Sequence, residues 1–127
     1  VADRIISEFN TKDYGRLSIL VNWRLNVKKI FDIKATSFKP MPKVESTVLF
    51  FEPKKNFFRF KNPKNLEKIT RIFFMHRRKM IKKPYKQLFN NNEDIALQMG
   101  INLNLRPQNL NFNTYYELTK KYEDLRS

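Results

Sequence analysis

The sequence has no cysteine, one histidine and two glycines. Without cysteine there is no disulfide and no thiolate metal site, and His76 alone makes a metal cluster implausible. His76 is followed directly by Arg77 and Arg78, and no Ser-His-Asp arrangement can be argued around it. Gly15 and Gly100 are too few and too far apart for a glycine-rich phosphate or nucleotide loop. The residues present therefore carry no complete catalytic arrangement.

Long apolar runs and a signal peptide are also missing. No run approaches the about 18 residues that span a bilayer, and Asp3 and Arg4 interrupt the N-terminus at once. With no cysteine as well, we expect a cytoplasmic protein that does not contact a membrane. The first residue is Val1, which indicates either a processed N-terminus or a piece of a longer chain.

Positive charge is abundant and unevenly placed. The chain has 26 Lys and Arg against 12 Asp and Glu, a formal net charge of +14. Residues 54–86 hold 13 of the basic residues and one acid, Glu67, whereas the rest of the chain is nearly neutral. A solvated basic face and an anionic lipid surface are alternatives, but a localised basic block next to an apolar helix face favours a nucleic acid, RNA in particular.

The first half of the sequence predicts two helices and two strands. The helices are expected at the start of the chain, up to Glu8, and over 14–24, where Asp13 would be the cap. The strands are expected over 26–33 and 44–51. The second strand is apolar on both faces, which predicts a central place in a larger sheet. Two strands are too few to be stable alone, so apolar exposure at Val48, Phe50 or Phe51 would indicate a missing N-terminal part.

The second half predicts helices only. A basic linker over 54–63 leads to a long helix over 65–83, with Leu66 and Met80 on its apolar face and Arg71 opposite. Pro84 would end or kink that helix. A short helix over 93–99 would end at Gly100, and a last helix over 114–125 would be capped by Asn113. The predicted fold class is α/β plus all-α, divided near Pro53 into segments 1–53 and 54–127.

Four motifs, in this order and spacing, resemble the ribosomal RNA adenine dimethyltransferase family. They are YGRLS at 14–18, FKPMPKVES at 38–46, RRK at 77–79 and LRPQNL at 105–110. The resemblance is nearest to the bacterial type that modifies two adjacent adenines of small-subunit (16S) rRNA, and erythromycin-resistance methylases share the earlier motifs. Glu45, His76 and Pro84 depart from the usual family residues.

The resemblance implies a Rossmann-like methyltransferase domain followed by a helical rRNA-binding domain. Segment 1–53 would be the C-terminal part of the catalytic domain, with its strands as the last antiparallel pair. Segment 54–127 would bind rRNA. The family's Asn-Leu-Pro-Tyr motif and the residues that bind S-adenosylmethionine would precede Val1. The chain would then be the C-terminal fragment of an rRNA adenine N6,N6-dimethyltransferase, a monomer acting on the pre-30S particle in ribosome biogenesis. The alternative is a non-catalytic basic rRNA-binding or ribosome-assembly module.

The resemblance also implies site residues. Phe38 would stack on the target adenine once it is flipped out, because Pro40 and Pro42 stiffen the loop that carries it. The alternative is that Phe38 closes the end of the sheet. Arg16 either anchors its helix or contacts RNA. The residues expected to bind RNA are Arg77, Arg78, Lys79, Lys82, Lys83, Arg71, Lys43 and Arg16.

Overall fold

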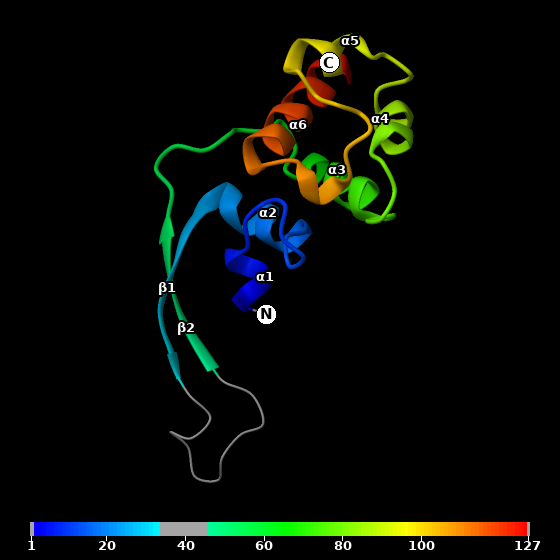
Figure 1. Cartoon of the computed structure of the whole chain (residues 1–127). Helices are drawn as coiled ribbons and strands as arrows, with labels where there is room; N and C mark the ends of the chain where they lie inside the picture. The colour runs from blue at the N-terminus through cyan, green and yellow to red at the C-terminus, as the bar shows by residue number, and fades with distance from the viewer. Residues whose placement is uncertain (1, 34–45, 127) are drawn as a thin grey trace.

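A helical body and a projecting β-hairpin make up the structure, a computed structural model that describes residues 2–33 and 46–126 (Figure 1). The chain begins with two helices, continues through the hairpin and returns to the helical body for its second half. In chain order the elements are α1 (Ala2–Ile6), α2 (Arg16–Arg24), β1 (Leu25–Ile33), β2 (Ser46–Pro53), α3 (Lys64–Phe74), α4 (Lys82–Leu88), α5 (Asp94–Met99), η2 (Pro107–Asn109) and α6 (Phe112–Arg126).

The hairpin consists of β1 and β2 paired antiparallel, with Leu25 opposite Pro53 and an irregular register between Lys29 and Phe31. Within the described ranges β2 has one partner strand, so the predicted central position is not observed. The apolar residues that suggested it are there and are uncovered: Phe50 is 50% exposed and Phe51 is 44% exposed. No described element covers these apolar side chains of β2.

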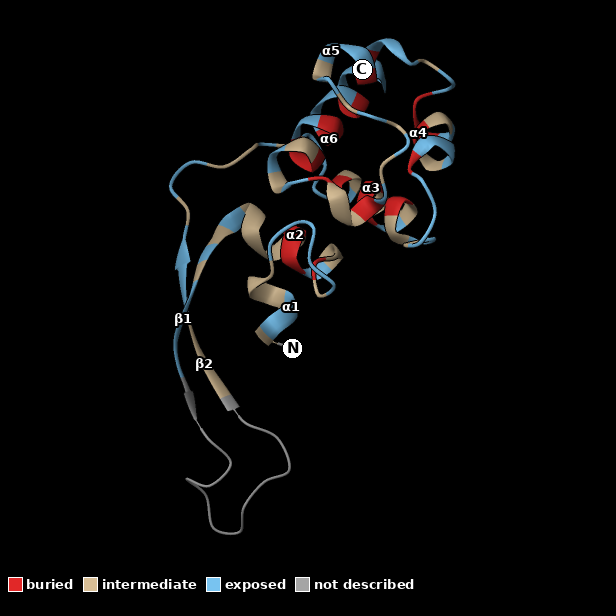
Figure 2. Ribbon diagram, in the orientation of Figure 1, coloured by how far each residue is buried: buried red, intermediate tan, exposed pale blue. Residues whose placement is uncertain are grey.

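The core lies in the helical body, where the buried residues gather (Figure 2). Tyr14 and Ile19, from the first segment, belong to the same buried cluster as Leu66, Phe73 and Tyr115 from the second. Helix α2 packs against both α3 and α6, which makes this shared core possible. The division into segments 1–53 and 54–127 stays a prediction. Helix α2 of the first segment packs against α3 and α6 of the second.

The long helix predicted over 65–83 is wrong, because α3 ends at Phe74 and a new helix begins at Lys82. Residues between them form turns. Pro84 excludes an unbroken helix through Met80, because its ring would clash with the Met80 carbonyl. The break begins earlier, however, since α3 already ends at Phe74 and the N–H of Ile81 donates to the carbonyl of Leu105, outside any helix. In the first turn of α4 Pro84 is tolerated. Met80 is therefore 51% exposed and not on a buried helix face, whereas Ile81 is fully buried.

The helix ends show which cap predictions hold. Gly100 ends α5 in the left-handed region, with φ of 68°, as predicted. Helix α6 begins earlier than expected, because the Oδ1 atom of Asn111 accepts the backbone N–H of Thr114 at 2.9 Å, and Asn113 lies inside the helix. Helix α2 begins later than expected, with Gly15 and not Asp13 at its N-cap.

The segment just before α3 is held by a residue distant in sequence. Glu123 on α6 is 4% exposed, and its carboxylate accepts the backbone N–H groups of Lys61 and Asn62, each at 2.9 Å. It also accepts a hydrogen bond from the side-chain amide of Asn65 at 2.8 Å. Both backbone N–H groups precede the helix, whose N-cap is Pro63, and a carboxylate near this end complements the helix dipole. Glu123 therefore fastens α6 to the start of α3.

Tyr14 gives a first testable prediction about this core. Its ring is fully buried, and its hydroxyl has no hydrogen-bond partner among the described residues. Burial, and secondarily Tyr116, raises the pKa of this phenol, so the hydroxyl stays neutral. Because an unpaired buried hydroxyl costs free energy, we expect Tyr14→Phe to raise the free energy of unfolding by about 1 kcal/mol in urea denaturation.

Tyr115 offers a matched control for this substitution. It is also fully buried, but its hydroxyl donates a hydrogen bond to the carbonyl of Pro107 at 2.5 Å. We therefore expect Tyr115→Phe to lower the free energy of unfolding by about 1 kcal/mol. Equal losses in both variants would show that the Tyr14 hydroxyl is satisfied after all.

Candidate nucleic-acid interface

A groove of about 910 Å³ lies on the helical body where basic side chains converge. We call it the basic groove. Its lining comes from the turn after α3, from α4, and from the loops on either side of α5. None of its described lining residues is acidic, and six are cationic: Arg78, Lys79, Lys82, Lys83, Lys86 and Arg106. Met80, Asn91 and Asn104 complete it.

The break between α3 and α4 shapes one side of the groove. Ile81 is buried at this break, and its N–H donates to the carbonyl of Leu105 at 2.8 Å. This bond joins the turn to the loop that carries Asn104 and Arg106. The cations of residues 78–83 are thereby placed beside Arg106, which lies more than twenty positions later in the chain.

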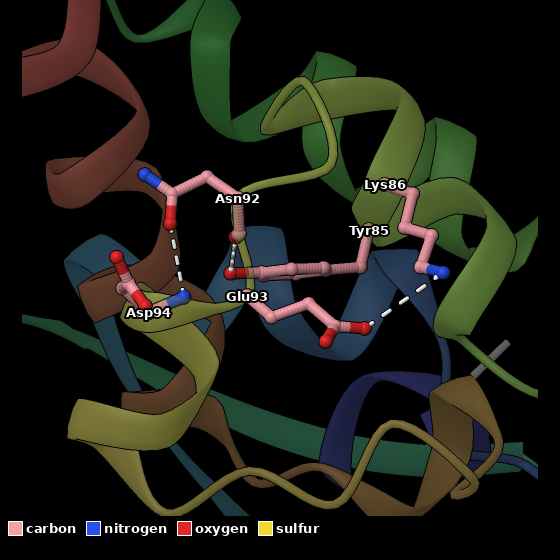
Figure 3. A network of polar contacts seen from close by, with 5 residues as sticks. All are labelled: Tyr85, Lys86, Asn92, Glu93 and Asp94. Atoms are coloured by element: carbon pink, nitrogen blue, oxygen red, sulfur yellow. Dashed lines mark hydrogen bonds and ion pairs between the residues drawn. The ribbon is translucent and has the colours of Figure 1, made fainter.

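A network of polar contacts fixes the loop between α4 and α5, which contributes Asn91 to the groove lining (Figure 3). The hydroxyl of Tyr85 donates to the carbonyl of Asn92 at 2.5 Å and accepts the N–H of Ala96 at 3.0 Å. Burial raises the pKa of Tyr85, so the phenol keeps the proton that it donates. The Oδ1 atom of Asn92 accepts the N–H of Asp94 at 2.9 Å. Asn91, with φ of 63°, sits in this fixed loop and lines the groove.

The one ion pair described at the groove, between Lys86 and Glu93, neutralises little of its positive charge. Lys86 lies 3.8 Å from the carboxylate of Glu93, and both side chains are well exposed. An exposed pair of this kind contributes little and is screened by salt. Side chains of one sign along a concave surface focus the field and raise the local concentration of anions. The basic groove is therefore suited to a polyanion whose phosphates contact several cations at once.

Four of the predicted RNA-binding residues meet in the groove, namely Arg78, Lys79, Lys82 and Lys83. Arg77 does not line it. Its guanidinium donates to the carbonyls of Lys12 at 2.7 Å and Thr11 at 3.4 Å, and it lies 5.7 Å from the centre of the Phe74 ring. The structure thus uses Arg77 to hold the turn after α3 against the loop before α2.

The remaining predicted residues lie elsewhere. Arg16 donates to the Thr70 hydroxyl at 3.5 Å and to the Glu67 carbonyl at 3.3 Å, which favours the anchoring alternative. Arg71 is exposed on α3 and does not line the groove. Phe38 and Lys43 lie outside the described residues, so their predicted roles stay predictions.

Sequence reasoning missed Lys86, Arg106, Asn91 and Asn104 as groove residues. Lys86 had a local signal, because it follows Lys82 by four positions on what proved to be one helix. Arg106 lies in the LRPQNL motif, but nothing in that motif indicates a neighbour near residue 80. Tertiary packing, through the Ile81 and Leu105 backbone bond, brings it there.

No metal centre accompanies the groove in the part of the chain that the structure describes. Residues 2–33 and 46–126 contain no group of histidine, cysteine and carboxylate side chains able to hold a metal ion. Nor does any helix in these ranges have the length and apolar character to cross a membrane. His76 lines a small cavity of about 150 Å³ beside the groove, together with Lys79, Met80 and Lys83.

Comparison with known proteins supports the interpretation drawn from the motifs. Residues 1–124 match the family described as Ribosomal RNA adenine dimethylase. The chain is 65% identical to Ribosomal RNA small subunit methyltransferase A of Pelagibacter ubique over 99% of its length and 48% of that protein. It is 41% identical to the protein of the same name from Ehrlichia ruminantium, over 93% of this chain and 45% of the relative. The chain thus spans about half the length of the curated relatives it matches.

Solved structures agree on the fold. A dimethyladenosine transferase from Plasmodium falciparum superposes with a TM-score of 0.75 at 22% identity, over 97% of this chain and 54% of that one. The 23S rRNA methyltransferase ErmE gives a TM-score of 0.59 at 17% identity, over 91% and 49%. The predicted fold class, the end of a methyltransferase sheet followed by helices, is confirmed. From its motifs, its fold and the match over residues 1–124, the chain belongs to the ribosomal RNA adenine dimethylase family.

Proposed function

We propose that this chain is part of an S-adenosylmethionine-dependent rRNA adenine N6,N6-dimethyltransferase, and that its basic groove binds the rRNA. The observation that carries the proposal is the groove itself, in which six cations and no carboxylate line one concave surface. Family membership supplies the reaction. The substrate would be two adjacent adenines of small-subunit (16S) rRNA, methylated in the cytoplasm during ribosome biogenesis.

The groove would hold folded rRNA by its phosphates. Arg78 and Arg106 offer planar guanidinium forks that match phosphate oxygens, and the groove lysines act as point charges. Such contacts recognise the shape of an RNA helix and not its sequence, because side chains cannot enter the deep, narrow major groove of A-form RNA. We propose the pre-30S particle as the natural partner, bound by a monomer.

The described residues do not fit S-adenosylmethionine. Their sheet is a two-stranded antiparallel hairpin, and neither Gly15 nor Gly100 belongs to a glycine-rich turn from a strand to a helix. The methyl donor would be bound by the part of the curated relatives that this chain does not match. The role of the described residues is therefore to bind and place the rRNA.

The proposal is tested with the protein whose sequence contains this chain, incubated with S-adenosylmethionine and small subunits that lack the modification. Mass spectrometry of the digested rRNA is expected to show dimethylation of two adjacent adenines. The 127-residue chain alone is expected to bind the same subunits without methylating them. If the whole protein binds but leaves every adenine unmodified, the non-catalytic assembly module becomes the correct description.

The proposed role of Phe38 is tested in the same assay. Stacking of a flipped base on an aromatic side chain contributes about 1–3 kcal/mol, so Phe38→Ala is expected to lower kcat/KM for methyl transfer by roughly tenfold to 100-fold. Phe9→Ala is a matched control, because Phe9 is an exposed aromatic residue (43%) in the loop between α1 and α2. Unchanged methyl transfer by Phe38→Ala would show that Phe38 only closes the end of the sheet.

A further inference from the structure

A second cavity, of about 380 Å³, lies on the helical body at the end of the hairpin. It is formed by the end of α2, the basic linker before α3 and the start of α6, and it shares no lining residue with the basic groove. Four of its lining residues are aromatic: Trp23, Phe57, Phe58 and Tyr116. We call it the aromatic cavity. Its volume is within the range of pockets that hold small ligands, about 300–1,000 Å³.

The walls of the aromatic cavity are held in place by hydrogen bonds and ring contacts. The indole N–H of Trp23 donates to the carbonyl of Phe58 at 2.6 Å, and the hydroxyl of Tyr116 donates to the carbonyl of Ile19 at 2.6 Å. The Trp23 and Phe57 rings meet edge to face at 6.1 Å, and the Phe58 and Tyr116 rings lie 5.5 Å apart. Such walls are set before a ligand arrives, which lowers the entropy lost on binding.

Cations surround these aromatic walls. The guanidinium of Arg24 lies 4.0 Å from the centre of the Phe57 ring, and that of Arg59 lies 4.7 Å from it. Lys54 lines the cavity, and burial lowers the pKa of its ammonium group. An anion beside Lys54 would offset this desolvation. Positive charge next to an aromatic cavity therefore favours a ligand that has both a flat ring and a negative group.

Two amides complete the lining. Asn56 and Asn113 are both part of the cavity lining, one from the linker and one from the first turn of α6. A carboxamide offers donors and an acceptor side by side, which matches the edge of a nucleobase. An acidic peptide would use the cations but would leave the aromatic walls and the two amides without a partner.

We infer that the aromatic cavity binds an unpaired nucleobase of RNA, with the base against the aromatic lining, an amide at its edge and a neighbouring phosphate on Lys54. This inference rests on the proposed function, since it supplies a second contact to the same RNA. Unpaired bases in loops and bulges are the part of an RNA that proteins read by stacking and by hydrogen bonds to base edges. The basic groove would hold a helix by its phosphates, and the aromatic cavity would hold one base displaced from the stack.

Trp23 makes the inference directly testable, because it is the only tryptophan of the chain. The 127-residue chain is titrated with the 5′-phosphorylated trinucleotide pApApA while tryptophan fluorescence is recorded. We expect saturable quenching. Lys54→Ala combined with Asn113→Ala is expected to raise the apparent Kd by about tenfold or more, because the phosphate and the base edge then have no partner. Lys64→Ala combined with Lys121→Ala removes two exposed cations that line neither the basic groove nor the aromatic cavity, and it is expected to change Kd by less than about twofold.

The second probe is a fully paired RNA duplex whose end is closed by a chemical linker in place of a nucleotide loop. It is expected to leave Trp23 fluorescence unquenched, because it presents phosphates but no free base. Quenching of equal strength by the duplex, or equal Kd values for the two double variants, would overturn the inference. If Trp23 fluorescence is not quenched but the chain still binds small-subunit rRNA, only the inference about the aromatic cavity is rejected. If Trp23 fluorescence is quenched but the basic groove binds no rRNA, the proposed function is rejected instead.

Discussion

Replacing Lys82 and Lys83 by glutamate is expected to weaken binding of small-subunit rRNA by roughly 100-fold at about 0.1 M salt. Both residues are exposed at the start of α4 and line the basic groove. The change removes two cations and adds two anions among the four remaining groove cations. The two glutamates repel the RNA phosphates that the lysines attracted, and fewer counterions are released from the RNA on binding. Fluorescence anisotropy of a labelled rRNA fragment, followed across a salt series, measures this directly.

The salt series separates groove contacts from the general attraction of a basic protein. Removing one phosphate-binding cation lowers the slope of log affinity against log salt by about 1, so alanine at both positions should lower it by about 2. The control is Lys64→Glu with Lys121→Glu, which makes the same change in net charge at exposed positions outside the groove. If the control weakens binding as much as the groove variant, net charge and not the groove determines affinity.

Glu123→Gln is expected to lower the free energy of unfolding by about 2–3 kcal/mol at neutral pH. The carboxylate is buried and accepts three N–H groups at the start of α3, from Lys61, Asn62 and Asn65. A glutamine has one acceptor oxygen, and its NH₂ group takes the place of the second carboxylate oxygen. Two N–H donors would then face each other. Urea denaturation of the two proteins measures the loss. Glu117→Gln, an exposed position on the same helix, is the matched control and should change stability by less than about 0.5 kcal/mol.

The stability difference between wild type and Glu123→Gln is expected to depend on pH. Burial alone would raise the pKa of Glu123, but the hydrogen bonds from Asn62, Asn65 and Lys61, together with Lys120, hold it below its ordinary value. A carboxyl group with a lowered folded-state pKa stabilises the fold above its unfolded pKa of about 4.3, and the contribution is lost as pH falls through the folded value. The difference between wild type and Glu123→Gln should therefore be constant from about pH 5 to pH 8 and shrink in acid. A difference that grows on acidification would contradict this assignment.

Local sequence signals were sufficient for several elements. Val48, Phe50 and their neighbours indicated a strand, and Gly100 indicated a helix end, because these features depend on residues adjacent in the chain. The single helix expected over 65–83 was wrong for a physical reason. The helical spacing continues as far as Met80, but α3 ends at Phe74, and the N–H of Ile81 donates to the carbonyl of Leu105, a contact between distant segments that no local pattern indicates.

The candidate site was predicted only in part, since its remaining residues meet through tertiary contacts. Arg77, Arg78 and Lys79 are adjacent and of one chemical kind, yet Arg77 turns toward the carbonyl of Lys12 while the other two line the groove. Arg106 joins them through a backbone bond between distant segments. The hydrogen bonds to Glu123 likewise have no local signal, because their donors lie about 60 positions earlier in the chain.

The most direct test of the rRNA-binding role is to map where rRNA touches the chain. The 127-residue chain, free or bound to unmodified small-subunit rRNA, would be treated with an acetylating reagent, and the acetylated lysines would be identified by mass spectrometry. The basic groove predicts that bound rRNA protects Lys79, Lys82, Lys83 and Lys86 from acetylation, while Lys64 and Lys121 stay reactive. Protection of Lys64 and Lys121 with none at the four groove lysines would contradict it.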